Sequence, residues 1–541
     1  MIRSFLILAL FTYFATLPRA QGCLSQGITF SSQGAIDSFT YYYPGCSIIE
    51  GDVYIAGNTI SNFDSLCHVV KIAGDLTIEF CGILQDLHGF SALEHIYGNL
   101  FIKSNAFLKH LWGLDALKSI DGRLLIENNH SLLSLEGLSS LQLIKQWCTI
   151  KSNFALSSVH GFSPLLQIGK SLEISNNPEL ATLDGLPKFK TLNGLGISNN
   201  YDLVTLSGLD SLSLITGVLH IKDNFSLLHL SGLSSLTSIE SDLTIENNDY
   251  LINLTGLNSL TDLGGSFTIQ DNDGLLSLHG MDALRSLSYF TLSRNSKLTN
   301  LSGLDSIQTI NNYFRIYSHG ALKSLVGLGK LDRLNGDLVI SDNTALTDLT
   351  GMSLLKRIGG DFRIEFNRSL TDLSPLQSIT SMSGKLTISN CDRLKSLYGL
   401  QNIDESGIRN LEITYSDSLS DCAYENICFY IYDENNAEIK INAPGCNSSE
   451  EVMNLCLVGI NGPLEEDGIS IFPNPTSGRI EIKYARQSAS DLKVLNAQGR
   501  LMKDVHMQDA SLDLKGLPDG MYFISIQFDD HRIIRRIMKI K

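Results

Sequence analysis

The sequence lacks the short motifs that identify most enzymes and metal-binding proteins. It contains no nucleophile elbow, P-loop, H-E-x-x-H or calcium-loop motif, and none of its ten cysteines forms a C-x-x-C pair. The missing cysteine pairs argue against a zinc site. Beyond its first residues the chain has no run of 18 or more apolar residues, so no transmembrane span is predicted. We therefore expect a protein that is not an enzyme and that holds no metal or cofactor.

Basic residues are also in short supply. The chain carries 41 lysines and arginines against 57 aspartates and glutamates, which gives a formal net charge of -16. An acidic protein repels the phosphate backbone of nucleic acids. We therefore expect no nucleic acid among its partners.

The first 20 residues have the pattern of a secretory signal peptide. Arg3 provides a short positive region, residues 5–14 are nearly all apolar, and Ala20 is a small residue suited to cleavage. The apolar run is too short to span a bilayer stably. A lipid anchor at Cys23 is an alternative, although the residues before it lack the usual leucine. Either interpretation predicts export.

Internal repetition is the strongest pattern in the chain. A glycine recurs in L-x-G-L at intervals of 24 residues, with two intervals of 23 and one of 48, and Pro375 stands in the long interval. An asparagine and a short L-x-I motif keep the same spacing. The glycines are residues 89, 113, 137, 161, 185, 208, 232, 256, 280, 303, 327, 351 and 399; the asparagines are residues 105, 129, 153, 177, 200, 224, 248, 272, 295, 343 and 367. Three markers in one register predict a repeat protein.

Each marker has a physical reason. The two apolar residues of L-x-I point inward from a short strand and the middle residue points outward. A buried asparagine can bond free backbone groups at a turn, and equivalent asparagines in successive coils can form a ladder. The glycine either adopts a conformation closed to other residues or allows two coils to approach closely. The pattern predicts a mainly β fold, a parallel β-solenoid of 24-residue coils. Stacked helix pairs are the alternative, which the repeated glycine, asparagine and serine oppose.

The repeat unit resembles leucine-rich repeats, and still more the receptor L-domain, over about residues 50–415. Cys81 and Cys391 occupy asparagine positions, where leucine-rich repeats also accept cysteine. This resemblance implies the fold strongly and the function weakly, because such scaffolds bind proteins, glycans or no known ligand.

Two flanking segments are expected to cap the solenoid, residues 21–49 and residues 416–456. Exported chains meet an oxidising compartment, so the cysteines of these segments are disulfide candidates. We expect Cys23 to pair with Cys46. The C-terminal group allows three pairings that the sequence leaves open; it consists of Cys422, Cys428, Cys446 and Cys456. The remaining cysteines lie inside the repeats and are expected to be free thiols.

The periodicity changes after a linker at residues 457–468. Residues 469–541 contain short alternating runs typical of a small antiparallel β-sandwich. This segment resembles the C-terminal sorting domain of the type IX secretion system of Bacteroidota. The matching motifs are residues 472–475 (FPNP), 496–500 (NAQGR), 517–523 (LPDGMYF) and the basic end at 535–541. The resemblance implies passage through the periplasm, contact with the secretion machinery through this domain, its removal, and a protein that is secreted or held at the outer cell surface. An ordinary β-sandwich is the alternative.

Three functions remain open. The first is a surface binding or adhesion protein that recognises an extracellular protein or a glycan. The second is a passive spacer or coat protein, and the third is a polysaccharide-degrading β-helix enzyme. Asp337 and Asp361, one coil apart, are the best carboxylate pair for such an enzyme, but both follow a glycine and suit a turn.

One set of aromatic and arginine side chains is predicted to form a ligand surface on the outward face of the strands. Aromatic residues and arginine are enriched at binding hot spots. The set consists of Tyr289, Tyr313, Arg315, Tyr317, Arg363 and Phe366. Phe101 and Trp147 are the alternative site, nearer the N-terminus.

Overall fold

The computed structural model describes residues 21–162, 164–432, 437–458, 469–474, 476–484, 491–496, 500–506, 511–527 and 532–540. The chain divides into two compact units, residues 1–331 and residues 332–541. The predicted signal peptide, residues 1–20, and most of the predicted linker, residues 459–468, lie outside the described residues. No helix within the described parts of the chain is long and apolar enough to cross a membrane.

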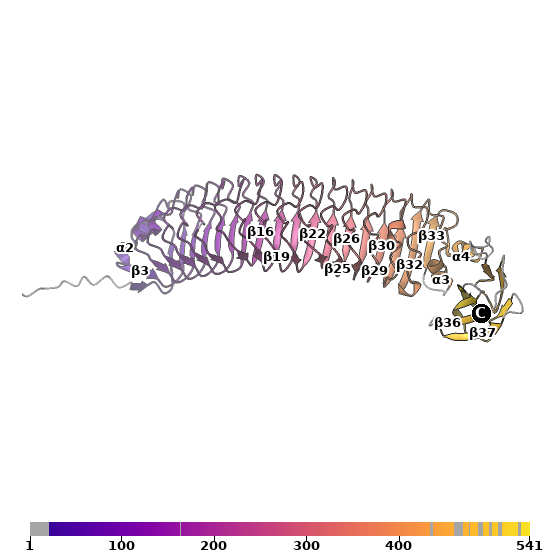
Figure 1. The fold of residues 1–541 in the computed structure, drawn as a ribbon. Helices are drawn as coiled ribbons and strands as arrows, with labels where there is room; N and C mark the ends of the chain where they lie inside the picture. Colours follow the sequence, from indigo (N-terminus) through magenta and orange to yellow (C-terminus); the bar gives the residue numbers. More distant parts are fainter. Residues whose placement is uncertain are drawn as a thin grey trace, which may run out of the picture. The chain divides into compact units, whose positions relative to one another are not determined.

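The parallel β-solenoid predicted from the sequence is confirmed, with about 17 turns. Each turn contributes one strand to a main parallel sheet (Figure 1). In the first unit these strands are β2 (Ile28–Phe30), β4 (Val53–Ala56), β6 (Leu76–Glu79), β8 (Leu100–Lys103), β10 (Leu124–Glu127), β12 (Cys148–Lys151), β14 (Ser171–Ser175), β16 (Gly194–Ser198), β18 (Leu219–Lys222), β20 (Leu243–Glu246), β22 (Ser266–Gln270), β24 (Tyr289–Ser293) and β26 (Phe314–Tyr317). In the second unit they are β28 (Leu338–Ser341), β30 (Phe362–Glu365), β31 (Gly384–Ser389), β32 (Ile408–Ser416) and β33 (Ala437–Asn442).

The L-x-I motif sets the register of this sheet. Leu124 pairs with Leu100 and Ile126 pairs with Ile102, so that equivalent residues of successive turns stand side by side. These four side chains are fully buried. Because strand side chains alternate between the two faces, the residue between the leucine and the isoleucine points outward in every turn.

A second set of short strands lies a few residues before the main strands in most turns, and it was not predicted from the sequence. Most of these strands are only two residues long, too short for an alternating pattern to be recognised. They are β1 (Gln21–Cys23), β3 (Cys46–Ile49), β5 (Lys71–Ile72), β7 (His95–Ile96), β9 (Ser119–Ile120), β11 (Leu143–Ile144), β13 (Gln167–Ile168), β15 (Thr191–Leu192), β17 (Leu214–Ile215), β19 (Ser238–Ile239), β21 (Asp262–Leu263), β23 (Ser286–Leu287) and β25 (Thr309–Ile310) in the first unit, and β27 (Arg333–Leu334) and β29 (Arg357–Ile358) in the second. Figure 1 labels β19 in this set.

The repeated glycine meets both of the requirements expected of it. Gly232 has φ of 110°, in the left-handed region that side chains disfavour. A Cβ atom on Gly232 would also lie 2.0 Å from the carbonyl oxygen of Leu206 in the preceding turn. The L-x-G-L motif therefore marks a point where the backbones of two successive turns approach closely.

The repeated asparagines form the predicted ladder inside the turns. The main-chain N–H of Asn105 donates to Oδ1 of Asn129 at 3.1 Å, and Nδ2 of Asn129 donates to the carbonyl of Ile102 at 2.8 Å. Both asparagines are fully buried. Each amide thus satisfies backbone groups that the core would otherwise leave without a partner.

Both ends of the repeat array carry the expected disulfide-bonded segments. At the N-terminal end these are α1 (Gln33–Asp37) and α2 (Phe39–Tyr42), with a bond between Cys23 and Cys46 whose Cα atoms are 5.8 Å apart. At the C-terminal end the helices are α3 (Glu425–Tyr432) and α4 (Ser449–Val458). Of the three pairings open there, the structure has Cys422–Cys446 and Cys428–Cys456. Strands β2 and β33 extend the main sheet into the segments 21–49 and 416–456. Short 3-10 helices lie in some of the turns; within the described residues they are η1 (Asp64–Leu66), η2 (His88–Phe90), η3 (Ser374–Leu376) and η4 (Glu405–Gly407).

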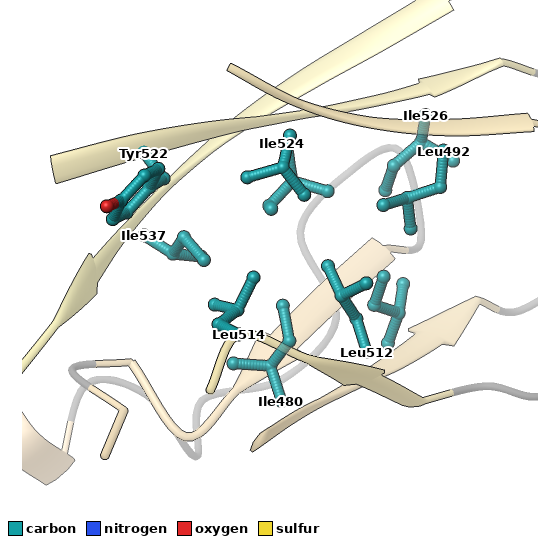
Figure 2. Packing of buried hydrophobic residues seen from close by; sticks show 10 residues of the cluster. Ile480, Leu492, Leu512, Leu514, Tyr522, Ile524, Ile526 and Ile537 are labelled. Atoms are coloured by element: carbon teal, nitrogen blue, oxygen red, sulfur yellow. The ribbon is translucent and has the colours of Figure 1, made fainter. Parts of the chain in front are cut away.

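The C-terminal segment forms two small antiparallel sheets that pack through one apolar core (Figure 2). Ile480, Leu512 and Leu514 lie on one side of this core, and Leu492, Ile524 and Ile526 on the other. The first sheet contains β34 (Ile469–Phe472), β35 (Arg479–Tyr484) and β38 (Ser511–Asp513), and the second contains β36 (Asp491–Asn496), β37 (Leu501–His506), β39 (Gly520–Gln527) and β40 (Arg532–Lys539). The predicted antiparallel β-sandwich is confirmed.

Candidate functional site

The outward face of the main sheet is largely covered by polar and charged side chains. In the first unit, lysines and glutamates of neighbouring strands pair along one stripe. Lys103 lies 2.7 Å from Glu79, and Lys151 lies 3.1 Å from Glu127. Burial alone would raise the pKa of Glu79, but the bonds from Lys103 and Tyr54 outweigh it and lower that pKa. The lysines of these pairs are partly exposed and Glu79 is buried; each pair contributes ~0.5 kcal/mol and covers the sheet rather than forms a site.

The first unit brings together most of the side chains predicted to bind a ligand. The rings of Tyr289 and Tyr313 meet edge to face, with centres 5.0 Å apart. The guanidinium of Arg315 lies over the Tyr313 ring, 4.3 Å from its centre. Tyr317 ends β26, where its carbonyl accepts a bond from the main-chain N–H of Arg294. Tyr289 and Arg315 are exposed, so an aromatic face beside a cation is open to solvent.

The two other predicted residues, Arg363 and Phe366, lie in the second unit. Nη2 of Arg363 donates to Oδ2 of Asp361 at 2.5 Å, and Arg363 is half-buried. Phe366 is exposed and has φ of 56°, a strained conformation for a bulky side chain. Most other turns place asparagine, aspartate or serine at this position. Arg363 is therefore held by its carboxylate partner, whereas Phe366 projects freely from the turn after β30.

The alternative aromatic pair, Phe101 and Trp147, offers less to a ligand. Phe101 is half-buried beneath the guanidinium of Arg123, which lies 5.6 Å from its ring centre. Trp147 is exposed, but it stands two turns from Phe101 in sequence register. The two rings do not make a contact with one another comparable to that between Tyr289 and Tyr313.

Asp337 and Asp361, the carboxylate pair predicted from the sequence, accept main-chain hydrogen bonds from the next turn. Oδ1 of Asp337 accepts the main-chain N–H of Asp361 at 2.9 Å, and Oδ1 of Asp361 accepts that of Lys385 at 2.9 Å. Burial alone would raise the pKa of Asp361, but the bonds from Lys385 and Arg363 outweigh it and lower that pKa. A general acid needs the opposite shift. The same pattern joins Asp52 to Asp75.

Among the described residues, no group of three or more histidine, cysteine, aspartate or glutamate side chains could hold a metal ion. Cys67, Cys81, Cys148 and Cys391 are free thiols, as expected. Burial raises the pKa of Cys81 to about 11 and that of Cys391 to about 12, and it raises the pKa of Cys148 further. The buried thiols are therefore protonated and unreactive.

His319 fills one place in the asparagine ladder. Its Nδ1 accepts from the main-chain N–H of Asn295 at 3.3 Å, and its Nε2 lies 3.1 Å from the carbonyl of Leu292. The ring is fully buried, and this burial lowers the pKa of His319. An imidazole thus replaces the amide because it also combines a donor and an acceptor.

An exposed apolar surface outside the strand face was not predicted from the sequence. It lies on the segments that follow the ladder asparagines, where Phe154, Tyr201, Phe225 and Tyr250 are all exposed. The signal was present in the sequence, because large apolar residues recur one, two or four positions after these asparagines.

One comparison with known proteins identifies the C-terminal part of the chain. Residues 470–541 match the family model of the secretion system C-terminal sorting domain. This segment is a sorting domain. It directs the protein to the cell surface or into the medium, and it implies an interaction with the type IX secretion machinery.

Comparison of the whole chain with solved structures gives a match of low sequence identity. No curated protein matches the sequence. Among solved structures, a leucine-rich repeat protein from Bacteroides ovatus ATCC 8483 matches with 14% sequence identity over 63% of this chain and 78% of that chain, with a TM-score of 0.16.

Proposed function

We propose that the protein is a secreted or surface-attached binding and adhesion protein, which recognises a glycan or an extracellular protein through the outward face of its main sheet. The observation that carries this proposal is the cluster of Tyr289, Tyr313 and Arg315 on neighbouring strands. An aromatic ring can stack on a sugar or pack against a partner protein, and arginine adds forked hydrogen bonds.

The proposal includes the division of the chain into domains. In it, residues 1–20 are a signal peptide, residues 50–415 are repeats related to receptor L-domains, and residues 457–468 link them to the sorting domain. The two cysteines at ladder positions, Cys81 and Cys391, support the relation to leucine-rich repeats. The sorting domain supports export, which a signal peptide would begin.

We also propose that the protein is not an enzyme and needs no cofactor. Support comes from Asp337 and Asp361, whose carboxylates already accept main-chain hydrogen bonds of the next turn. A spacer protein is the second candidate function. The lysine and glutamate pairs beside β6, β8, β10 and β12 favour it, because such a solvated face offers no anchor for a ligand.

A screen of the exported protein against glycans and surface proteins tests the binding function. We expect Tyr313→Ala combined with Arg315→Ala to weaken the binding of any ligand found by at least about tenfold, as loss of a hot spot does. Tyr97→Ala is the matched control, because Tyr97 is an exposed tyrosine outside the strand face. If the double variant bound the ligand as well as the parent protein, the binding site would lie outside this face. If the screen found no ligand, the spacer function would be favoured.

A further inference from the structure

The segments that follow the ladder asparagines form a continuous surface in the first unit. We call it the apolar edge and define it as the five residues beginning at each ladder asparagine from Asn129 to Asn272, which are residues 129–133, 153–157, 177–181, 200–204, 224–228, 248–252 and 272–276. In each segment the first residue is the buried ladder asparagine and the fourth is a buried core leucine, whereas the second, third and fifth residues are partly or fully exposed.

Main-chain hydrogen bonds hold successive segments directly against one another. The N–H of Leu228 donates to the carbonyl of Val204 at 3.1 Å, that of Ile252 to Leu228 at 3.2 Å, and that of Leu276 to Ile252 at 2.9 Å. Four aliphatic side chains at the fifth position therefore stand in a row. Six intervals of about 4.8 Å make the whole edge roughly 29 Å long.

Aromatic rings run beside this aliphatic row. The rings of Tyr201 and Phe225 stack with centres 5.3 Å apart and planes 16° apart, and those of His130 and Phe154 stack at 4.4 Å and 18°. Tyr250 follows, and 65% of it is exposed. Soluble proteins seldom expose an apolar surface of this extent unless it binds something.

The ring geometry argues against sugar as the ligand of this edge. A sugar ring stacks on an open aromatic face. Here Tyr201 and Phe225 each turn one face toward the other, as His130 and Phe154 do, so these faces are closed to a sugar ring. Stacked rings flanked by aliphatic side chains suit the side chains of another polypeptide.

The charge of the apolar edge is of one sign. Its seven segments contain no lysine or arginine, but they contain Glu179, Asp202, Asp249 and Asp273. Asp249 is exposed next to Tyr250, and Asp273 is exposed three residues before Leu276. Burial, and then the nearby carboxylates, of which Asp273 contributes most, raise the pKa of Asp249, as expected where negative charge is poorly compensated.

Equivalent segments further along the chain have the opposite character. Residues 295–299 and 319–323, in the same unit, carry Lys297 and Lys323 and no large apolar side chain outside the core. The change from apolar and acidic to polar and basic occurs while the core leucines and the ladder continue. Packing of the solenoid therefore does not require the apolar residues of the edge.

We propose that the apolar edge binds a segment of another protein that carries apolar side chains together with lysine or arginine. Apolar side chains of the partner would cover the aliphatic row and the stacked rings beside it. Its lysine or arginine side chains would meet Asp202, Asp249 and Asp273. Anionic lipid surfaces are disfavoured by the same acidic residues. A second copy of the chain is disfavoured because two apolar edges would oppose acid to acid, and the basic segments offer no large apolar side chain. This surface goes beyond the strand-face site and stands without it.

Fluorescence anisotropy with labelled peptides tests the proposal on the full chain. The probe is a leucine–lysine peptide of about 18 residues, which as a helix matches the length of the edge. A leucine–glutamate and a serine–lysine peptide of equal length are the comparators. We expect saturable binding of the leucine–lysine peptide and at least about tenfold weaker binding of both comparators. If the leucine–glutamate or the serine–lysine peptide bound as tightly as the leucine–lysine peptide, the requirement for both apolar and basic side chains in the partner would be refuted.

Variants locate the peptide on the edge. Combining Tyr201→Ser, Phe225→Ser and Ile252→Ser should weaken leucine–lysine binding at least about tenfold. Tyr97→Ser with Tyr398→Ser removes exposed rings elsewhere and should leave binding unchanged. Asp249→Asn with Asp273→Asn should weaken binding several-fold at low salt and reduce its salt dependence.

Retained binding by the triple variant would overturn the proposal. So would a concentration-dependent dimer in sedimentation that the triple variant abolishes, since the edge would then belong to a second copy. Neither outcome concerns Tyr313 or Arg315. The proposal for the apolar edge can therefore be refuted without affecting the proposal for the strand-face site.

Discussion

Oδ1 of Asn200 accepts a hydrogen bond from the main-chain N–H of Asn177, 3.1 Å away and one turn earlier in the solenoid. Nδ2 of Asn200 donates to the carbonyl of Ile174 at 2.9 Å, and both asparagines are fully buried. The ladder thus joins the backbones of successive turns where the strands end. One side chain serves two buried backbone groups.

Replacing this asparagine should destabilise the solenoid. We expect Asn200→Ala to lower the free energy of unfolding by ~1–3 kcal/mol, because the N–H of Asn177 loses its buried partner. Asn200→Cys should cost less, since Sγ of Cys81 and of Cys391 lie within 3.9 Å and 3.8 Å of the equivalent carbonyls. Chemical denaturation measures both, and an Asn200→Ala protein as stable as the parent would contradict the role of the ladder.

Gly232 and Gly34 should respond in opposite ways to the same substitution. Gly232→Ala places a Cβ 2.0 Å from the Leu206 carbonyl on a backbone with φ of 110°, so we expect a loss of several kcal/mol or failure to fold. Gly34 in α1 has no atom within 4 Å of an added Cβ, so Gly34→Ala should leave stability unchanged or raise it by up to ~1 kcal/mol. Thermal melting compares the stabilities of the two variants. Equal effects of both substitutions would contradict the close approach of two turns at Gly232.

The buried imidazole of His319 should make stability depend on pH. Burial depresses its pKa below the ordinary 6.5, so below pH 6.5 the unfolded chain binds a proton that the folded chain resists. Stability is therefore full above pH 6.5 and is lost as the pH falls toward the depressed value. His319→Asn should remove this loss. Thermal melting of the parent and the variant at pH 7.5 and pH 5 tests this prediction. Other histidines, including the partly buried His220, contribute equally to the pH dependence of both proteins.

The four free cysteines should differ sharply toward an alkylating reagent. Cys67 is only partly buried, whereas Cys81, Cys148 and Cys391 are buried and have raised pKa values. We expect iodoacetamide to modify Cys67 in the native protein and the other three only after unfolding. Peptide mapping without reduction reads both this pattern and the three disulfides. Rapid native labelling of Cys148 would show that the turns open.

The exported form should be shorter than the chain. The sorting domain at residues 470–541 and the signal pattern at residues 1–20 predict a product that begins near Gln21 and ends before about residue 469. Mass spectrometry of the protein collected from the cell surface and medium measures both ends. An outer-surface form that still ends at Lys541 would exclude removal of the sorting domain.

Most of the solenoid could be predicted from the sequence because its repeat is local. Leucine, glycine and asparagine recur with one period, and each has a single physical task within the turn, such as the φ of Gly232 or the hydrogen bonds of Asn200. The strands of two residues, such as Ser119–Ile120, could not be predicted. A pair of residues carries no alternation, and only hydrogen bonding to the next turn makes it a strand.

The candidate sites show the same division. The sequence placed Tyr289, Tyr313 and Arg315 on one face, because period and alternation fix direction, but only the structure brought ring and guanidinium into contact. The apolar edge was not predicted because its exposed residues lie outside the strands and at varying offsets from the ladder asparagines.

By itself, the sequence determined the repeat, the direction of each side chain and the export domain, because these follow from spacing along the chain. Tertiary structure alone decided which cysteines pair at the C-terminal end, since Cys422 meets Cys446 only when the chain has returned through β33. It also decided that Asp337 and Asp361 serve the backbone of the next turn. Both depend on distances between residues far apart in sequence, which packing sets and spacing does not.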